Sequence, residues 1–321
     1  MRISAQAVAA LLALAPVALH AQAYPAKPVR LVVGFPAGGG VDVIARQLAQ
    51  ELARPLGQSV VVDNRPGAAG NIAAELTAKS PPDGHTLMIG NVGTLTINPS
   101  LYQKLPFDSL RDFAPVSLVA TVMLVVVVHP SLPVKNLREL VTLARGRPGQ
   151  LNFGSAGSGG ITHLAAELLK AQNGIALVHV PYKGSAPAFT DLVGGHLQVM
   201  IDSIPVPLPL VQAKRRRALA VTATRRSPAL PEVPTTAEAG LPQFVASGWQ
   251  GIVAPAGTPA AIVARLNGDI GRVLNQPEFR DKLILQGSDP APGTPEQFGA
   301  FIRSELAKWA EVVRVSGAKL D

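Results

Sequence analysis

Three glycine-rich segments are the parts of this sequence whose residue types and spacing best suit the binding of a ligand. They span residues 35–42, 90–94 and 154–160, and each follows a run of β-forming residues and precedes a helical pattern. The first turn of a helix leaves backbone N–H groups without intrahelical acceptors and carries a partial positive charge, so it binds carboxylate or phosphate without a basic side chain. Glycine lets a ligand come close to the backbone. One such segment is typical of an ordinary tight connection, but three of them favour an anion-binding site.

Polar side chains in and beside these segments have competing interpretations. Asp42 and Ser158 stand where each can cap the helix that follows, and for Asp42 capping and ligand binding are equally consistent with the sequence. His163 lies one turn into the helix after the third segment and is the histidine best placed for chemistry, but a partly buried side chain bonded locally is the favoured interpretation. None of the three segments contains Lys or Arg, so an anion bound there would depend on backbone donors.

Other chemistries lack their motifs. The best argument for a dinucleotide fold is Asp63 at the end of a predicted strand, but the G-x-G-x-x-G pattern is not found in its expected setting. The chain has no P-loop, no G-x-S-x-G elbow, no H-E-x-x-H pair and no cysteine. We therefore expect no metal and no cofactor. An exported serine hydrolase using Ser158 and His163 remains an alternative, although their spacing does not favour a catalytic pair and no orienting acid is evident.

The elements that must position these segments alternate along the chain. Strand patterns are predicted at 29–35, 60–63, 86–90, 118–128, 151–154, 177–180, 199–202, 218–222 and 249–254. Helical patterns are predicted at 41–52, 70–78, 137–144, 161–172, 187–193, 259–274, 278–286 and 295–316. This alternation is typical of an α/β fold with a largely parallel sheet, in which a ligand binds outside the carboxyl ends of the strands.

The pattern of strands starts twice, which predicts two lobes. We expect two strands to cross between them, near Thr121–Val128 and Ser247–Ala254. One lobe would comprise residues 24–123 plus 250–321, and the other, residues 124–249, would be inserted into it.

Residues 1–23 have the layout of a secretory signal peptide. Arg2 supplies a positive charge, residues 7–19 are apolar apart from Pro16, and a small-x-small pattern ends at Ala23. The apolar run is shorter than the roughly 20 residues that a spanning helix needs. We expect export, cleavage after Ala23 and a periplasmic location, with no lipoprotein anchor because no cysteine follows the cleavage site.

The chain is basic, with 29 Lys and Arg against 21 Asp and Glu and a net charge of +8. Aromatic residues make up only 4% of the sequence, and an exported protein meets little nucleic acid, so nucleic-acid binding is not expected. Attraction of anionic solutes fits the charge better. The basic run at residues 214–217 is typical of a solvated helix end or loop.

Eight motifs, in order along nearly all of the chain after residue 23, resemble those of the Bug receptors, the tripartite tricarboxylate transporter receptor family. They are FPAGGGVD (35–42), DNRPGAAGN (63–71), PDGHTL (82–87), GSAGSG (154–159), HLAAE (163–167), VPYKG (180–184), VPTT with EAG (233–236 and 238–240), and APAGTP (254–259). The resemblance implies a periplasmic-binding-protein-like fold of the two-lobed Venus-flytrap kind (type II). It also implies carboxylate ligands held largely by backbone amides and water.

The resemblance also implies a set of ligand-binding residues. In the first lobe they are Ala37, Gly38, Gly39 and Asp42, with Asn91 and Thr94 nearby. In the second lobe they are Ser155, Ala156, Gly157, Ser158, Gly159 and Thr162, with Tyr182 and Asp202 closing the pocket. Asp202 also has a structural interpretation as a strand-end cap; if it faces the pocket, it would favour a ligand that carries an amine or hydroxyl. Val41 departs from the small hydroxyl residue of many relatives, which leaves the identity of the carboxylate open.

The partners follow from the same resemblance. A closed receptor would be recognised by membrane transporter subunits of the tripartite type or by a sensor kinase, and a ligand sensor without a transport role is the alternative. We expect a monomer.

Overall fold

The computed structural model describes residues 24–213 and 217–316. The predicted signal peptide, its cleavage site and most of the basic run at 214–217 lie outside these residues. Within them, no helix is both long enough and apolar enough to cross a membrane.

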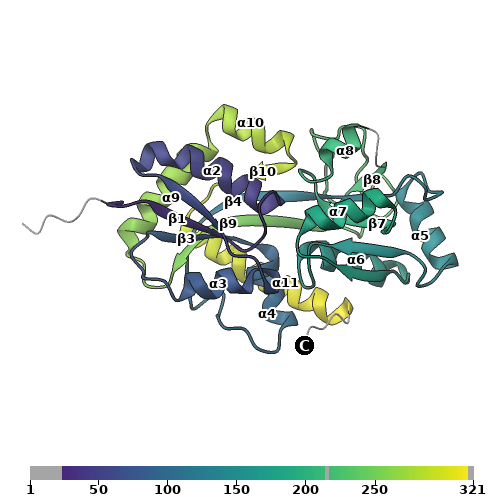
Figure 1. Cartoon of the computed structure of the whole chain (residues 1–321), viewed down its shortest axis with the longest axis horizontal. Coiled ribbons are helices and arrows are strands. Elements are labelled where there is room, and N and C mark those ends of the chain that lie inside the picture. Colours follow the sequence, from purple (N-terminus) through teal and green to yellow (C-terminus); the bar gives the residue numbers. More distant parts are fainter. Residues whose placement is uncertain (1–23, 214–216, 317–321) are drawn as a thin grey trace, which may run out of the picture.

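The described residues form ten strands that fall into two groups joined in the middle (Figure 1). The strands are β1 (Val29–Val33), β2 (Val60–Asn64), β3 (Thr86–Asn91), β4 (Phe113–Val128), β5 (Asn152–Ser155), β6 (Val178–Pro181), β7 (Val199–Ser203), β8 (Arg217–Val221), β9 (Ser247–Pro255) and β10 (Ser288–Pro290). In the first lobe β2, β1 and β3 are parallel, and β9, the first part of β4 and β10 continue the sheet in antiparallel pairs. In the second lobe β6, β5 and β7 are parallel, and both β7 and β8 pair antiparallel with the second part of β4.

Helices cover both faces of each sheet. They are α2 (Gly40–Leu56), α3 (Asn71–Ala78), α4 (Asn98–Leu101), α5 (Leu137–Gly146), α6 (Ile161–Asn173), α7 (Ser185–Gly194), α8 (Leu208–Gln212), α9 (Ala260–Leu274), α10 (Pro277–Leu285) and α11 (Pro295–Ser316), with short turns η2 (Ala68–Gly70) and η3 (Gly93–Ile97). In the first lobe α2, α9 and α10 pack on one face and α3, α4 and α11 on the other. In the second lobe α5 and α6 cover one face and α7 and α8 the other. Each lobe is therefore a three-layer sandwich with its own core.

Helix α2 shows why the sequence forms these elements. Ile44, Leu48 and Leu52 recur at helical spacing and are fully or almost fully buried against the first sheet. The helix ends at Gly57, whose positive φ of 68° is the left-handed conformation that commonly terminates a helix. This packing fixes where the N-terminus of α2, with its glycine-rich segment, must lie.

The two lobes share strand β4 and meet along β9. Strand β4 pairs with β9 as far as Met123 opposite Ser247, and from Leu124 onward it pairs with β7. Strand β4 begins at Phe113, five residues before the predicted strand. Pro115 lies inside this extension, next to an irregularity in the register. Because proline cannot donate a ladder hydrogen bond, a sequence pattern that contains it is normally interpreted as the end of a strand.

Candidate ligand-binding site

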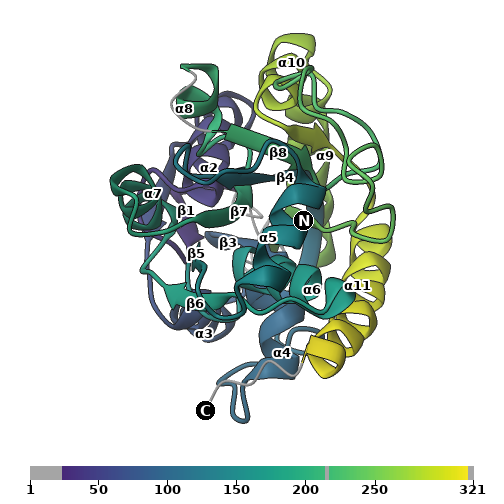
Figure 2. The same cartoon turned by 90° about the vertical axis from the view of Figure 1, so that its right-hand side faces the viewer.

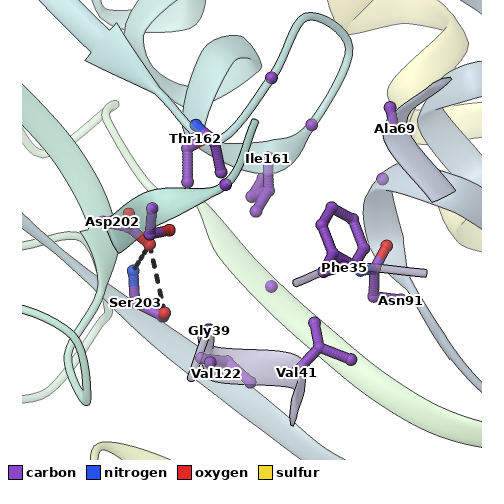
Figure 3. A pocket seen from close by; sticks show the side chains of 18 of the residues that line it. Phe35, Gly39, Val41, Ala69, Asn91, Val122, Ile161, Thr162, Asp202 and Ser203 are labelled. Atoms are coloured by element: carbon purple, nitrogen blue, oxygen red, sulfur yellow. Dashed lines mark hydrogen bonds between the residues drawn. The ribbon is translucent and has the colours of Figure 1, made fainter. Parts of the chain in front are cut away.

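A cavity of about 100 Å³ lies between the two lobes at the carboxyl ends of their parallel strands. First-lobe residues 35–37, 39–41 and those around Asn91 form one side of it, and second-lobe residues around Gly157, Thr162 and Asp202 form the other. Figure 3 shows Asp202, Ser203, Ile161 and Thr162 across the open space from Phe35, Asn91 and Ala69. The position agrees with the general rule for ligand sites in α/β sheets.

Three α-helices begin at this cavity: α2, α6 and α7. Their first turns contribute Gly40 and Val41, Ile161 and Thr162, and Ser185 and Ala186 to its walls. The short turn η3 adds a fourth start at Gly93. Because first-turn N–H groups have no intrahelical acceptor, the cavity is bordered by backbone donors from both lobes. The start of α7 was not among the three glycine-rich segments that the sequence singled out.

Glycines allow the lobes to touch around this cavity. A Cβ added to Gly40 would lie 2.7 Å from the Ser203 hydroxyl of the other lobe, and one added to Gly93 would lie 3.4 Å from the Cα of Gly160. A Cβ added to Gly184, whose φ is 116°, would lie 3.4 Å from the ring of Pro36. The observed arrangement therefore depends on positions without side chains on both rims.

Asp42 holds the first glycine-rich loop in place. Its Oδ2 accepts hydrogen bonds from the Gly38 N–H at 2.8 Å and from Arg46 Nε at 2.9 Å, and its Oδ1 accepts one from Asn64 Nδ2 at 2.8 Å. Burial raises the pKa of this carboxyl, but the hydrogen bonds from Arg46, Gly38 and Asn64 outweigh it and leave the pKa below its ordinary value. The side chain does not line the cavity, so Asp42 is a positioning residue.

Asn91 has one end fixed and one end free. Its Oδ1 accepts a hydrogen bond from the Thr94 N–H at 2.9 Å, which fixes the amide plane. Its Nδ2 has no hydrogen-bond partner among the described residues, and Asn91 lines the cavity. Thr94 is fully buried and donates to the carbonyl of Ala69. Asn91 therefore offers a side-chain donor to the cavity, and Thr94 supports it from behind.

The second-lobe loop is also held by bonds within itself. The Ala156 N–H donates to Thr162 Oγ1 at 2.9 Å, and the Gly159 N–H donates to His163 Nδ1 at 3.1 Å. Ser155 is fully buried, and its Oγ lies 2.7 Å from His179 Nε2. The rings of His163 and His179 stack with their centroids 3.9 Å apart. A layer of two histidines thus supports the loop on the side away from the cavity.

Asp202, at the end of β7, is 2% exposed and forms part of the cavity wall. Its Oδ1 accepts hydrogen bonds from the N–H of Ser203 at 2.7 Å and from the Ser203 hydroxyl at 3.2 Å (Figure 3). Its Oδ2 has no hydrogen-bond partner among the described residues. Burial raises the pKa of Asp202 to about 6, although the neighbouring Ser185 and Ser203 oppose the shift.

Tyr182 lies outside the cavity wall. Its hydroxyl donates to Asp191 Oδ2 at 2.5 Å, and burial followed by the effect of Asp191 raises its pKa to about 12. The side chain packs against the second-lobe core that α7 and α8 cover. Next to it in sequence, Lys183 lines the cavity, is exposed and has no ion pair or hydrogen bond among the described residues. The motif that contains both residues was noted in the sequence, but only its tyrosine was taken as a site residue.

The structure therefore divides the predicted site residues into two sets. The cavity is lined by Ala37, Gly39, Asn91, Ala156, Gly157, Thr162 and Asp202. The remaining ones do not line it: Gly38, Asp42, Thr94, Ser155, Ser158, Gly159 and Tyr182. Lining residues that the sequence did not identify include Lys183 and Ser185, and also apolar side chains, which are Phe35, Val122, Leu124 and Ile161. A ligand-binding role for any of these residues remains a prediction.

The serine hydrolase alternative depends on a pair that the structure does not form. His163 Nδ1 accepts from the Gly159 N–H rather than from Ser158. In this loop it is Ser155 that contacts a histidine, but Ser155 is fully buried and does not line the cavity, and no carboxylate contacts the Nδ1 of its partner His179 in the described part of the chain. Among residues 24–213 and 217–316 there is also no group of three His, Cys, Asp or Glu arranged to hold a metal ion.

Comparison with known proteins identifies the family. The family model described as "Tripartite tricarboxylate transporter family receptor" matches residues 44–318. BugT of Bordetella pertussis is 42% identical over 303 residues, which cover 94% of this chain and 93% of BugT. A UPF0065 protein from the tcbD-tcbE intergenic region of Pseudomonas sp. (strain P51) is 44% identical over 292 residues, 91% of this chain and 87% of that protein.

Solved structures agree with the sequence relatives. An R. palustris protein with adipate has a TM-score of 0.90 and 40% identity, covering 92% of this chain and all of that one. MatC from Rhodopseudomonas palustris with bound malate has a TM-score of 0.86 and 34% identity, covering 90% of this chain and all of that one. The periplasmic binding protein BugD has the same fold, with a TM-score of 0.87 and 32% identity over 92% of this chain and 99% of that one. These structures confirm the predicted periplasmic-binding-protein-like fold class, and together with the family model they show that the chain belongs to the tripartite tricarboxylate transporter receptor family.

Proposed function

We propose that this chain is an exported periplasmic receptor that captures a small carboxylate between its two lobes and performs no catalysis. The observation that carries the proposal is the convergence of three helix N-termini, from both lobes, on one cavity. Such a set of backbone donors binds an anion without a charged partner. Relatives solved with adipate and with malate support the choice of a carboxylate.

The rest of the lining favours a ligand with an apolar body. Phe35, Val41, Val122 and Ile161 form the walls between the helix starts and Asn91. Contact with these side chains stabilises methylene groups, whereas a second carboxylate could reach the free Nδ2 of Asn91. The unpaired ammonium of Lys183 at the cavity would attract anions and raise their association rate, in keeping with the positive net charge of the chain. A short dicarboxylate satisfies all of these groups.

Capture would proceed by closure of one lobe onto the other. In an open form the ligand binds the donors of one lobe, and closure brings the donors of the other lobe onto it. We place the hinge where β4 passes from one sheet to the other and β9 begins, with lobes of residues 24–123 plus 250–321 and 124–249. The closed form gains contacts that the open form lacks, so ligand binding shifts the equilibrium toward it.

The closed receptor would then be recognised by membrane transporter subunits of the tripartite type. A ligand sensor that signals without transport would use the same cavity and the same closure. Capture of membrane proteins by the tagged, ligand-loaded protein separates the two by the identity of the captured partner, which is a transporter subunit for transport and a sensor kinase for signalling.

A thermal-shift screen of the protein against mono-, di- and tricarboxylates tests the binding proposal. A ligand present at 100 times its dissociation constant adds about 2.7 kcal/mol to the free energy of unfolding. The site assignment is tested with Gly39→Leu, because a Cβ at Gly39 meets only the Pro36 carbonyl at 3.5 Å and the longer side chain would extend into the cavity. Gly146→Leu, at an exposed position with open space around it, is the matched control.

We expect a shift with a dicarboxylate in the native protein and in Gly146→Leu, and none in Gly39→Leu. Retained affinity in Gly39→Leu would place the site elsewhere. No shift with any carboxylate would remove the proposed ligand class.

A further inference from the structure

One acidic side chain stands in a cavity that otherwise presents donors and apolar groups. Among the described residues that line the cavity, Asp202 is the sole carboxyl. Its neighbours in the wall are backbone donors, the Thr162 and Ser185 hydroxyls and aliphatic side chains. An acceptor in this setting does not contribute to anion binding, so its presence calls for a separate explanation.

The Ser185 hydroxyl also acts on this carboxyl, yet the two carboxyl oxygens are not equally satisfied. Oδ1 takes both hydrogen bonds from Ser203, whereas Oδ2 is buried without a partner. No Lys or Arg forms an ion pair with Asp202 among the described residues, although Lys183 lines the same cavity. A buried acceptor left unpaired is costly, and a donor that reaches it restores the lost interaction. In Figure 3 Asp202 lies at the edge of the open space, across it from Phe35 and Asn91.

The position of Asp202 relative to the helix starts says which part of a ligand would meet it. Ser203, bonded to Asp202, lies next to the first residue of α2, since a Cβ on Gly40 would be 2.7 Å from its hydroxyl. Ser185, whose hydroxyl acts on the Asp202 carboxyl, is the first residue of α7. A ligand carboxylate held by the first turns of α2 and α7 would therefore have its adjoining carbon beside Asp202.

We propose that the ligand carries a hydroxyl or ammonium group on the carbon next to its carboxylate, and that Asp202 Oδ2 accepts a hydrogen bond from this group. The proposal rests on the proposed function and specifies the ligand class of the same cavity: 2-hydroxy or 2-amino acids, preferred over unsubstituted acids of the same length. Asp202 acts here as a specificity residue that contacts the ligand directly.

The test compares acids that differ only at that carbon. Dissociation constants are measured by isothermal titration calorimetry for succinate, malate and aspartate, and for adipate, 2-hydroxyadipate and 2-aminoadipate. In the native protein we expect a substituted acid to bind at least about tenfold more tightly than the unsubstituted acid of its length, as for a hydrogen bond to a charged group. The hydroxy and amino arms identify which donor is used.

Variants separate recognition from folding. Asp202→Ala should abolish the preference by weakening the substituted acid at least tenfold while leaving the unsubstituted acid within about threefold. Glu232→Gln, at an exposed position in the same lobe, removes an acid without touching the cavity and is the control. Asp202→Asn retains shape and offers a weaker acceptor, so it should retain the fold, as judged by its melting temperature, and lose most of the preference.

Three results would overturn the proposal. One is equal binding of substituted and unsubstituted acids by the native protein. Another is an equal loss for both in Asp202→Ala, which would make the residue structural. The third is a preference for the substituted acids that survives undiminished in both Asp202→Ala and Asp202→Asn, which would place the recognition of the substituent at another residue. Absence of all carboxylate binding would instead contradict the proposed function itself.

Discussion

Around the cavity, three of the most buried polar side chains hold the loops and do not line the open space. Asp42, Thr94 and Ser155 are 2%, 0% and 0% exposed, and each bonds to backbone or side-chain groups close to its own loop. The groups left for a ligand are mostly backbone N–H groups, whose positions these side chains fix. Preorganised donors of this kind bind charge without having to rearrange first.

Asp42→Ala should therefore cost stability as well as binding. The substitution leaves the Gly38 N–H without its acceptor, and it removes one of the two hydrogen bonds that Asn64 Nδ2 donates and one of the two partners of Arg46. We expect a loss of about 2–3 kcal/mol in the free energy of unfolding, measured by urea denaturation, and a loss of ligand affinity because the loop is no longer fixed.

Arg46→Ala is the control for this prediction. It removes one partner of Asp42 but leaves the two loop contacts, and the Arg46 side chain is 53% exposed, so its effect should stay below about 1 kcal/mol. The pKa of Asp42 is held below its ordinary value, so the stability it contributes is present above the unfolded-state pKa and is lost as pH falls through the folded-state pKa. A stability of Asp42→Ala equal to the native value at neutral pH would contradict this role.

The sequence predicted which loops border the cavity better than it predicted which side chains face the cavity. The glycine-rich segments and the helix starts after them follow from local patterns, and Ala37, Gly39 and Gly157 all line the cavity. Lys183 escaped notice because nothing local shows that the start of α7 turns toward the other lobe. Whether a polar residue faces the cavity or its own loop depends on tertiary packing, as the contrast between Asp202 and Ser155 shows.

At the scale of elements, a layer of aromatic rings joins β5, α6 and β6. The ring of His179 stacks on those of both Phe153 and His163, and Ser155 at the end of β5 contacts its Nε2. Burial and then the neighbouring His163 lower the pKa of His179 to about 4, which Glu167 opposes. Protonation of His179 is therefore less favourable in the folded state than in the unfolded state.

This arrangement predicts a loss of stability in mild acid. Between pH 6.5 and about 4 the unfolded state binds a proton at this histidine and the folded state does not, so the free energy of unfolding falls as pH falls. His179→Phe keeps the stacking and removes the titrating group. We expect it to flatten this part of the pH profile, measured by urea denaturation at fixed pH values. His196→Gln, at an exposed position, should leave the profile unchanged.

Titration of Asp202 changes the free energy of unfolding in the opposite direction over part of the same pH range. Its folded-state pKa is raised to about 6, so the stability linked to it is full below the unfolded-state value and is lost as pH rises through 6. The native profile thus contains both effects, and the difference between native and His179→Phe isolates the histidine. A difference that does not change with pH would show that His179 is already protonated or that its stacking tolerates the charge.

Helices with amphipathic patterns and strands of β-branched residues were predictable because their signals are local. The predicted helices at 259–274, 278–286 and 295–316 correspond to α9, α10 and α11 within one residue at each end. The three-residue strand β10 was missed, since a segment that short has no periodicity and exists only through its pairing with β4. The first part of β4 was missed for a similar reason, because its pairing with β9 overrides the proline within it.

At the scale of the whole molecule, the two lobes also meet away from the cavity. Leu164 of α6 belongs to the same buried cluster as Trp309 and Trp249 of the first lobe, and helices α6 and α11 lie side by side (Figure 2). The chain has two tryptophans, and both are 1% exposed in this cluster. Trp309 is therefore an intrinsic reporter of contact between the lobes, once Trp249 is replaced by phenylalanine.

We expect closure to depend on the missing side chain at Gly40. In Gly40→Val the new side chain would clash with the Ser203 hydroxyl, which already lies 2.7 Å from the Cβ position, and hold the lobes apart. Ligand affinity should fall about 100-fold, the equivalent of two lost hydrogen bonds.

In the Trp249→Phe background, ligand should shift Trp309 emission to shorter wavelength, and Gly40→Val should remove that shift. Gly146→Val, in open space, should retain it. If Gly40→Val lost affinity but kept the Trp309 shift, the lobes would still close and the defect would lie in the α2 donors themselves. If it kept both, closure would not require this approach, and the contact between Gly40 and Ser203 would be incidental to capture.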